Sequence, residues 1–97
     1  MFMVTSTYTA APDAIAAALP AHRIWVGDLY DRGVFFLSGR LQPPTGGFMM
    51  AKGVTRDALE AILASDPFRE ANLLTHTILE LSPTRWAPEL ASLGETP

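Results

Sequence analysis

The chain has 97 residues, of which 48% are hydrophobic, and its ten acidic and seven basic residues give a net charge of −3 at neutral pH. This length fits one domain with one hydrophobic core, and the acidic balance argues against DNA or RNA as a partner, because phosphate binding requires a basic surface. The lack of cysteine excludes disulfides, thiolate metal sites and a cysteine nucleophile, and no apolar run approaches the roughly 18 residues of a membrane-spanning helix.

The N-terminal third predicts one strand and one helical region. Residues 2–8 are mostly apolar, β-branched or aromatic, which is typical of a strand. Pro12-Asp13 marks a helix start, because proline suits a first turn and aspartate there complements the helix dipole. Pro20 is expected to break or kink this helix and to open a second segment over 20–32. Gly33 is the expected stop.

The rest of the chain predicts three more strands and a second helix. Thr55 can cap a helix, and Asp66-Pro67 is a further cap signal that opens a short helical turn. The tail 83–97 carries three prolines and is expected to lie along the surface. The predicted elements are strand 34–41, loop 42–47, strand 48–52, helix 56–64, helical turn 67–72 and strand 73–81.

The order β-α-β-β-α-β predicts an α+β fold of the ferredoxin-like type. Right-handed crossovers then give a four-stranded antiparallel sheet with both helices on one face. We expect a single domain over residues 1–97, with a core of 1–82 and a C-terminal tail of 83–97.

Both faces of this predicted sheet carry apolar residues. Two helices can cover only one face, so a second copy of the chain is expected to cover the other, giving a homodimer. Coverage by the tail is the alternative, but residues 83–97 hold few apolar groups. In the second strand, one face is expected to carry Phe35, Leu37 and Leu41, and the other Val34 and Phe36. In the fourth strand, one face is expected to carry Leu74 and Ile78, and the other Leu79 and Leu81.

The main candidates for chemistry are His22 and Asp66. His22 shares a helical stripe with Val26 and Leu29 that should face the sheet. It is therefore either a hydrogen-bonded core histidine or a catalytic base. Asp66 before Pro67 is a common N-cap arrangement, but the predicted topology also brings Asp66 to the same end of the sheet as His22.

Other residues at that end of the sheet complete a plausible small-molecule site. Arg40 either binds a carboxylate or is a solvated charge at a strand end. His76 stands alone in the last strand and is expected to be structural or exposed, and two histidines without ligand-like spacing argue against a metal site. The predicted substrate-binding residues are Tyr8, Trp25, Ser38, Arg40, Thr45 and Gly46.

The order and spacing of several short motifs over residues 1–90 resemble those of the YciI-like (YCII-related) bacterial domains. The motifs are Pro20-Ala21-His22 with Trp25, Gly33, Ser38-Gly39, Thr45-Gly46-Gly47, Ser65-Asp66-Pro67-Phe68 and Ser82-Pro83-Thr84-Arg85. One departure is Arg40, since many relatives have proline there.

This resemblance implies a ferredoxin-like domain that dimerises through its sheets as an α+β barrel, similar to muconolactone isomerase. It also implies an active site built on a His–Asp pair, here His22 and Asp66. Some relatives are linked to elimination of chloride from chlorinated ring-cleavage acids, so an isomerase or lyase is the class to test.

Two functions therefore stay open. In the first, the chain is a cytoplasmic, cofactor-independent isomerase or lyase, in which His22 and Asp66 perform acid/base chemistry on a small carboxylate or lactone held by Arg40. In the second, it is a non-catalytic dimer that binds a small ligand or has a structural role. Catalysis requires an accessible imidazole nitrogen in the cleft, whereas a structural histidine has both nitrogens satisfied inside the protein.

Overall fold

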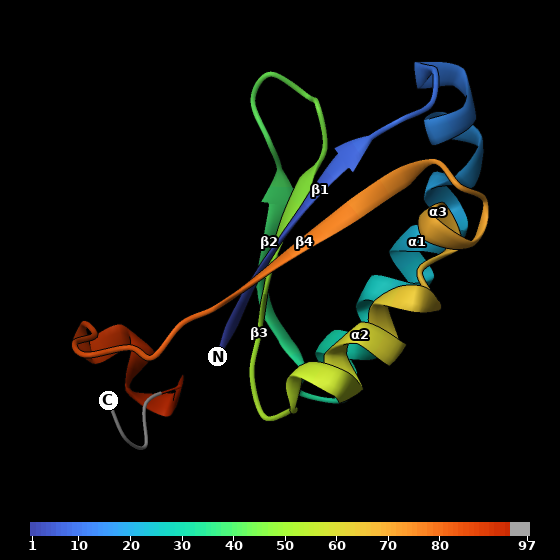
Figure 1. Cartoon of the computed structure of the whole chain (residues 1–97). Coiled ribbons are helices and arrows are strands. Elements are labelled where there is room, and N and C mark those ends of the chain that lie inside the picture. Colours follow the sequence, from blue (N-terminus) through green and yellow to red (C-terminus); the bar gives the residue numbers. More distant parts are fainter. Residues whose placement is uncertain (94–97) are drawn as a thin grey trace.

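The computed structural model describes residues 1–93 and shows one antiparallel sheet with its α-helices on one face (Figure 1). The strand order is β2-β3-β1-β4, so the α1 crossover joins two strands that have β3 between them. This is the predicted ferredoxin-like arrangement. The elements are β1 (Phe2–Tyr8), α1 (Pro12–Asp31), β2 (Phe35–Arg40), β3 (Gly47–Ala51), α2 (Arg56–Ala64), α3 (Pro67–Glu70), β4 (Leu74–Glu80) and a final 3-10 helix, η1 (Pro88–Leu93).

The residues predicted to cap or stop helices lie at helix ends in the structure. The Thr55 side chain accepts a hydrogen bond from the Ala58 backbone N–H at 3.1 Å, which satisfies one of the free donors at the start of α2. Asp66 caps α3 in the same way. Gly33 follows α1 with a φ of +74°, a conformation that glycine adopts without strain.

Two local predictions are wrong. Pro20 does not divide the first helix, because α1 continues through it to Asp31. Proline removes the hydrogen bond from its own nitrogen, and its ring crowds the carbonyl of Ala16 one turn earlier, but the remaining hydrogen bonds keep α1 a single helix. In β2, Phe35 and Leu37 do not share a face: a bulge at Phe36 shifts the register, so Phe35 is buried and Leu37 is 53% exposed. In β4 the predicted alternation is confirmed, with Leu74 buried and Leu79 exposed.

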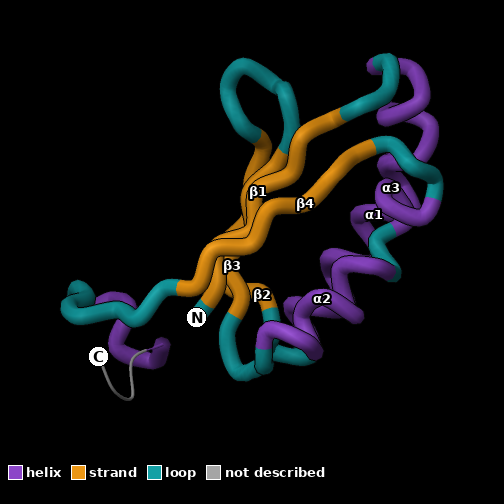
Figure 2. Tube along the Cα trace, viewed as in Figure 1, coloured by secondary structure: helices purple, strands orange, loops and turns teal. Residues whose placement is uncertain are grey.

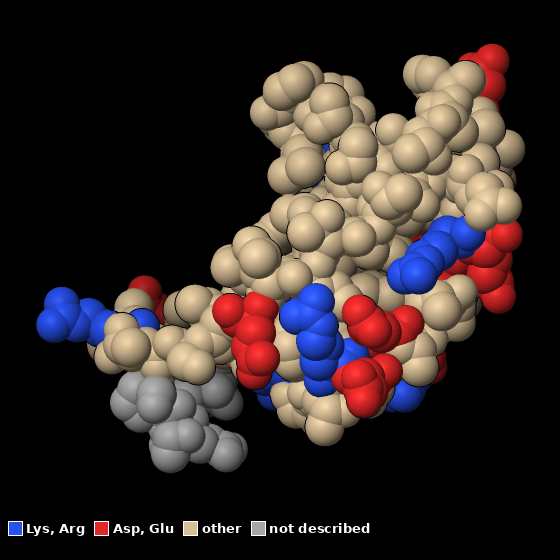
Figure 3. All heavy atoms as spheres, viewed as in Figure 1, with Lys and Arg blue, Asp and Glu red and all other residues tan. Residues whose placement is uncertain are grey.

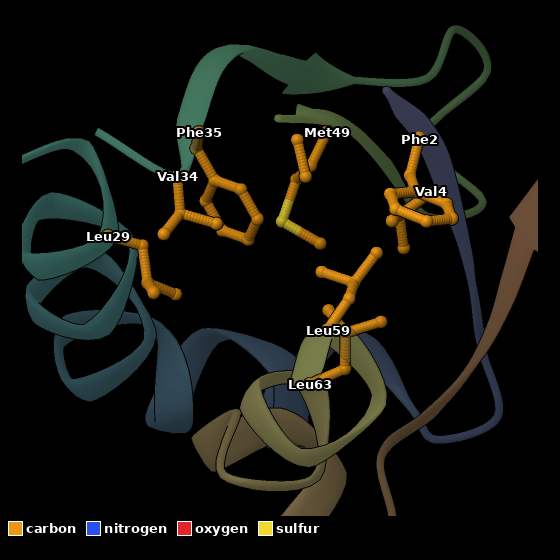
Figure 4. Packing of buried hydrophobic residues seen from close by; sticks show 9 residues of the cluster. Phe2, Val4, Leu29, Val34, Phe35, Met49, Leu59 and Leu63 are labelled. Carbon is orange, nitrogen blue, oxygen red and sulfur yellow. The ribbon is translucent and has the colours of Figure 1, made fainter. Parts of the chain in front are cut away.

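The core lies between the sheet and the first two helices (Figure 4). Side chains from β1, β2 and β3 point toward Leu29 of α1 and toward Leu59 and Leu63 of α2. Burial of these apolar side chains holds the two layers together. The sheet side of this core consists of Phe2, Val4, Val34, Phe35, Met49 and Ala51.

The face of the sheet opposite the helices carries no α-helix (Figure 1). At one end of this outer face, tail residues Pro83, Trp86 and Leu90 line a cavity of about 270 Å³ together with Leu37 and Met50. The tail, which Figure 2 shows apart from the three α-helices, thus contacts the outer face at one end. The last part of the predicted tail, residues 94–97, lies outside the described residues.

Charged side chains are unevenly distributed on the side shown in Figure 3. Acidic and basic groups alternate over the helical layer, while the surface over the loop between β2 and β3 is almost free of charge. No helix within residues 1–93 is both long enough and apolar enough to span a bilayer.

The loop between β2 and β3 packs closely on the end of β1. The Tyr8 N–H donates to the Thr45 carbonyl at 2.8 Å, and the Leu41 N–H donates to the Gly46 carbonyl at 3.0 Å. A Cβ atom at Gly46 would overlap the backbone carbonyl of Ser6. Gly46 is therefore required for this close approach of two backbones.

We predict that Gly46→Ala destabilises the protein by about 1–3 kcal/mol, because the loop must move away from β1 to admit the methyl group. Gly27→Ala is the control, since a Cβ at Gly27 meets nothing within 4 Å and alanine is the better helix former, which should stabilise α1 by about 0.5–1 kcal/mol. Urea unfolding at matched protein concentration measures both. Equal midpoints for wild type and Gly46→Ala would contradict the packing described.

Candidate functional site

A cavity of about 290 Å³ opens at the end of the sheet where β1 finishes. It lies between α1, the sheet and α3, and its wall contains both polar and apolar residues. The apolar ones include Leu19 and Val26 of α1, Phe68 of α3 and Leu74 of β4. The residues with polar or titratable side chains in the wall are Ser6, Tyr8, His22, Arg23, Ser38, Arg40 and Asp66.

His22 and Asp66 meet in this cavity wall. The distance from His22 Nδ1 to Asp66 Oδ1 is 2.9 Å, a hydrogen bond between the middle of α1 and the start of α3. The His22 ring stacks on Phe68, with a centroid distance of 4.1 Å and an interplanar angle of 14°. The His22 side chain is 19% exposed and the Asp66 side chain is fully buried. The predicted proximity of the pair is therefore found.

Asp66 Oδ1 also accepts the Phe68 backbone N–H at 2.9 Å. One oxygen thus caps α3 and binds His22 at the same time. The two interpretations of Asp66, as a helix cap and as the partner of His22, are both correct. Because the Asp66 side chain is fully buried, it contacts the cavity through its neighbour His22.

Asp66 is ionised at neutral pH. Burial of the carboxyl group raises its pKa, but this is outweighed by the His22 hydrogen bond, the contact with His76, the His22 charge and the Phe68 N–H, which together lower the pKa of Asp66 to about 2. An ionised carboxylate only accepts hydrogen bonds, so His22 carries a proton on Nδ1. In neutral His22, the lone pair is then on Nε2, which has no hydrogen-bond partner within residues 1–93.

His76 was expected to be structural or exposed, and it is buried, with a side chain that is 2% exposed. The sequence analysis did not predict its neighbour: His76 Nε2 lies 3.4 Å from Asp66 Oδ2. The contact does not have hydrogen-bond geometry. Register places His76 opposite Ser6 of β1, on the face toward the helices. No local motif indicates this neighbour, because only the path of β4 beneath α3 brings it to Asp66.

Three of the predicted substrate-binding residues line the cavity. Tyr8 comes from the end of β1, and Ser38 and Arg40 come from β2. The Ser38 hydroxyl is 2.7 Å from the Tyr30 hydroxyl at the end of α1, so a hydrogen bond fixes it at the cavity edge. Arg23 was not predicted but also lines the cavity, next to His22 in α1. Neither Arg23 nor Arg40 forms an ion pair within the described part of the chain.

The other three predicted substrate-binding residues, Trp25, Thr45 and Gly46, are not part of the cavity wall. Trp25 Nε1 donates to Ser65 Oγ at 3.0 Å, which ties α1 to the residue before Asp66. Thr45 and Gly46 join the β2–β3 loop to β1. Their observed contacts are structural, and their contact with a ligand stays a prediction.

His22, Asp66 and His76 form a row rather than a convergent set of ligands, since each histidine contacts a different carboxylate oxygen. Within residues 1–93, no three His, Cys, Asp or Glu side chains are arranged to hold a metal ion.

Comparison with known proteins identifies relatives of this chain. A family model described as the YCII-related domain matches residues 1–82. No curated protein sequence matches the chain.

Two solved structures share its fold. One is 5-chloro-2-hydroxyhydroquinone dehydrochlorinase (TftG) from Burkholderia phenoliruptrix AC1100, in complex with 2,5-dihydroxybenzoquinone: 15% identity, TM-score 0.69, with 84% of this chain and 94% of that chain covered. The other is an antibiotic biosynthesis monooxygenase with 19% identity and a TM-score of 0.56, with 86% and 100% covered. At these identities the likeness shows the fold alone.

We predict that Asp66→Asn destabilises the protein near neutral pH by about 2 kcal/mol, because the pKa of Asp66 is about 2 in the folded chain and about 3.9 in an unfolded one. A lowered carboxyl pKa stabilises the folded state above the unfolded value. This contribution is lost as pH falls from about 4 through 2. Asparagine can still accept the Phe68 N–H, so the helix cap is retained.

Urea unfolding between pH 7 and pH 2.5 measures the difference between wild type and Asp66→Asn, which should shrink at the acid end. The exposed Asp57→Asn serves as the control for loss of one negative charge, with an expected change of about 0.3–1 kcal/mol because Asp57 lies in the first turn of α2. A difference for Asp66→Asn that stays constant over this range would show that the charge of Asp66 does not stabilise the fold.

Proposed function

The chain belongs to the YCII-related domain family, and from this premise we propose that it is a small-molecule enzyme of isomerase or lyase type. Its substrate is a small carboxylate or lactone. His22 is the general acid/base, and Asp66 positions the His22 ring and stabilises its charged form.

The main support for this proposal is the hydrogen bonding and the exposure of the His22 ring. Nδ1 is bound to a buried carboxylate, while the ring itself lines a cavity and is 19% exposed. A purely structural histidine would have both nitrogens satisfied within the protein. In His22, Nδ1 is hydrogen-bonded to Asp66, whereas Nε2 has no partner within residues 1–93 and can bind a ligand.

The proposed reaction begins when His22 Nε2 takes a proton from a carbon next to a carbonyl or carboxylate group. The C–H electron pair then forms a new double bond. In an isomerisation, the proton returns from His22 to a different carbon. In an elimination, a leaving group such as chloride departs with its bonding pair. Only a proton and electron pairs move, so the reaction requires no cofactor.

The charge of the cavity supports an anionic substrate. The chain as a whole is acidic, yet the cavity is lined by Arg23 and Arg40, and the only carboxylate among its described lining residues, Asp66, is buried and hydrogen-bonded to His22. Arginine binds carboxylates with two parallel hydrogen bonds. We propose that Arg40 holds the substrate carboxylate and that Arg23 strengthens the positive potential.

The elimination variant is supported by the dehydrochlorinase with the same fold, because a dehydrochlorinase removes a chloro substituent. A shared fold does not fix chemistry, and the monooxygenase neighbour has a different activity. The proposal therefore depends on His22, Asp66 and the arginines of this cavity.

We also propose that the chain forms a homodimer through the outer face of the sheet. Register places Leu37, Met50, Met3 and Leu79 in one row across all four strands on this face. Leu37 and Leu79, at its ends, are more than half exposed. A contiguous apolar row of this kind is typical of an interface between copies.

We predict that His22→Gln lowers turnover by about a hundred-fold to ten-thousand-fold, because glutamine keeps a similar polar volume but cannot accept and return a proton near neutral pH. The assay uses a panel of unsaturated carboxylates, lactones and halogenated muconates with the wild-type protein first. Thermal unfolding is measured for both proteins.

If His22→Gln keeps full turnover and only melts at a lower temperature, His22 is structural and the catalytic proposal is wrong. If panel compounds bind to the wild type but none is converted, the chain is a binding module instead.

We predict that light scattering of the wild type at micromolar concentration gives about twice the chain mass of 10.5 kDa. Leu79→Glu should lower the mass to that of one chain, because it places a charge in the interface. Ile24→Glu is the control, since Ile24 is 77% exposed on α1, away from the outer face, and this variant should remain dimeric. A monomeric wild type would contradict the dimer.

A further inference from the structure

The buried contact between His76 and Asp66 is not explained by the acid/base role of His22. His76 Nε2 and Asp66 Oδ2 are 3.4 Å apart, and both atoms are buried without a hydrogen-bond partner among the described residues. His76 Nδ1 is also buried and unpaired. Buried polar atoms without partners destabilise a folded protein, so such atoms are normally paired.

The protonation of this contact follows from Asp66. Because the carboxylate is ionised, Oδ2 can only accept a hydrogen bond. His76 must then carry its proton on Nε2 to satisfy it. A hydrogen bond across this 3.4 Å contact then requires that the Nε2–H of His76 point at Oδ2.

We propose that His76 is a positioning residue that acts on His22 through Asp66. The two imidazoles contact one carboxylate: Oδ1 accepts a hydrogen bond from His22 Nδ1, and Oδ2 lies 3.4 Å from His76 Nε2, its proposed donor. The Nε2–H of His76 withdraws negative charge from Asp66, so Asp66 stabilises protonated His22 less strongly. His22 therefore releases its proton more easily and can return it to the product. This inference rests on the proposed function.

The path of the chain favours this arrangement. His76 belongs to β4 and is paired with Ser6 of β1, so its ring is held by the sheet and not by a mobile loop. His22 Nδ1 keeps its place on Oδ1 without His76, because the Phe68 N–H fixes that oxygen. Removal of His76 should thus change the charge felt by His22 more than its geometry. The other titratable or charged groups facing this cavity are Tyr8 from β1, Arg23 from α1 and Arg40 from β2.

The test compares His76→Phe with His76→Gln by NMR titration of the His22 ring in the full chain without ligand. Phenylalanine keeps the ring volume but removes the donor, while the glutamine amide nitrogen can replace Nε2. The His22 titration midpoint should rise by about half a pH unit or more in His76→Phe and return toward the wild-type midpoint in His76→Gln. A structural histidine would change the melting temperature without this pattern.

An unchanged or lowered His22 midpoint in His76→Phe, or equal midpoints in the two variants, would overturn the proposal. If neither variant folds, long-range ¹H–¹⁵N spectra of the wild type decide. A proton on His76 Nε2 at neutral pH supports the proposal, and a proton on Nδ1 alone overturns it.

These titrations need no substrate, so they distinguish failure of this inference from failure of the enzyme function. If a panel compound is turned over, the acid limb of the pH–rate profile should move to higher pH in His76→Phe and not in His76→Gln. An unmoved limb in His76→Phe would overturn the role of His76 while leaving His22 as the base. If His22→Gln keeps full turnover, His22 is not the base, and the catalytic proposal fails even where the NMR titrations show that His76 and His22 are coupled.

Discussion

One buried carboxylate connects three separate parts of this fold. Asp66 caps α3 through the Phe68 N–H, binds α1 through His22 and contacts β4 through His76. A buried charge without such partners would be strongly unfavourable, so the position of each neighbouring element is coupled to the others. The α1–α3 contact, the stacking of His22 on Phe68 and the cavity beside them all depend on this residue.

The same carboxylate explains how a small acidic chain can present a basic cavity. Its charge is held by hydrogen bonds inside the protein, so it is not available to repel a ligand. Arg23 and Arg40 reach the cavity from α1 and from the edge strand β2, without ion-pair partners in the described residues. The net charge of the chain is negative, whereas the cavity is lined by two arginines. The two differ because the net charge also counts the charged residues on the surface of the helices (Figure 3).

The elements that the sequence predicted well are those with a local physical signal. Thr55, Gly33 and Asp66-Pro67 act through hydrogen bonds or backbone angles within a few residues, and each marks an element end in the structure. The β2 bulge depends on pairing with β3, and the continuity of α1 through Pro20 depends on the whole helix. His76 was missed for the same reason, because its partner is ten residues away in sequence and meets it only after the sheet has formed.

The fold by itself does not select a reaction. A dehydrochlorinase and a monooxygenase both share it, so one backbone arrangement supports chemistry of different kinds. The chemistry of this chain depends on the side chains at one end of the sheet. His22 is hydrogen-bonded through one ring nitrogen to the buried Asp66, which also contacts His76. Arg23 and Arg40 line the same cavity without ion-pair partners within residues 1–93. The buried ring of His76 contacts the same carboxylate that binds His22, so one residue links β4 to α1 beside the cavity. This link depends on side chains and not on the backbone, so likeness of fold alone cannot predict it.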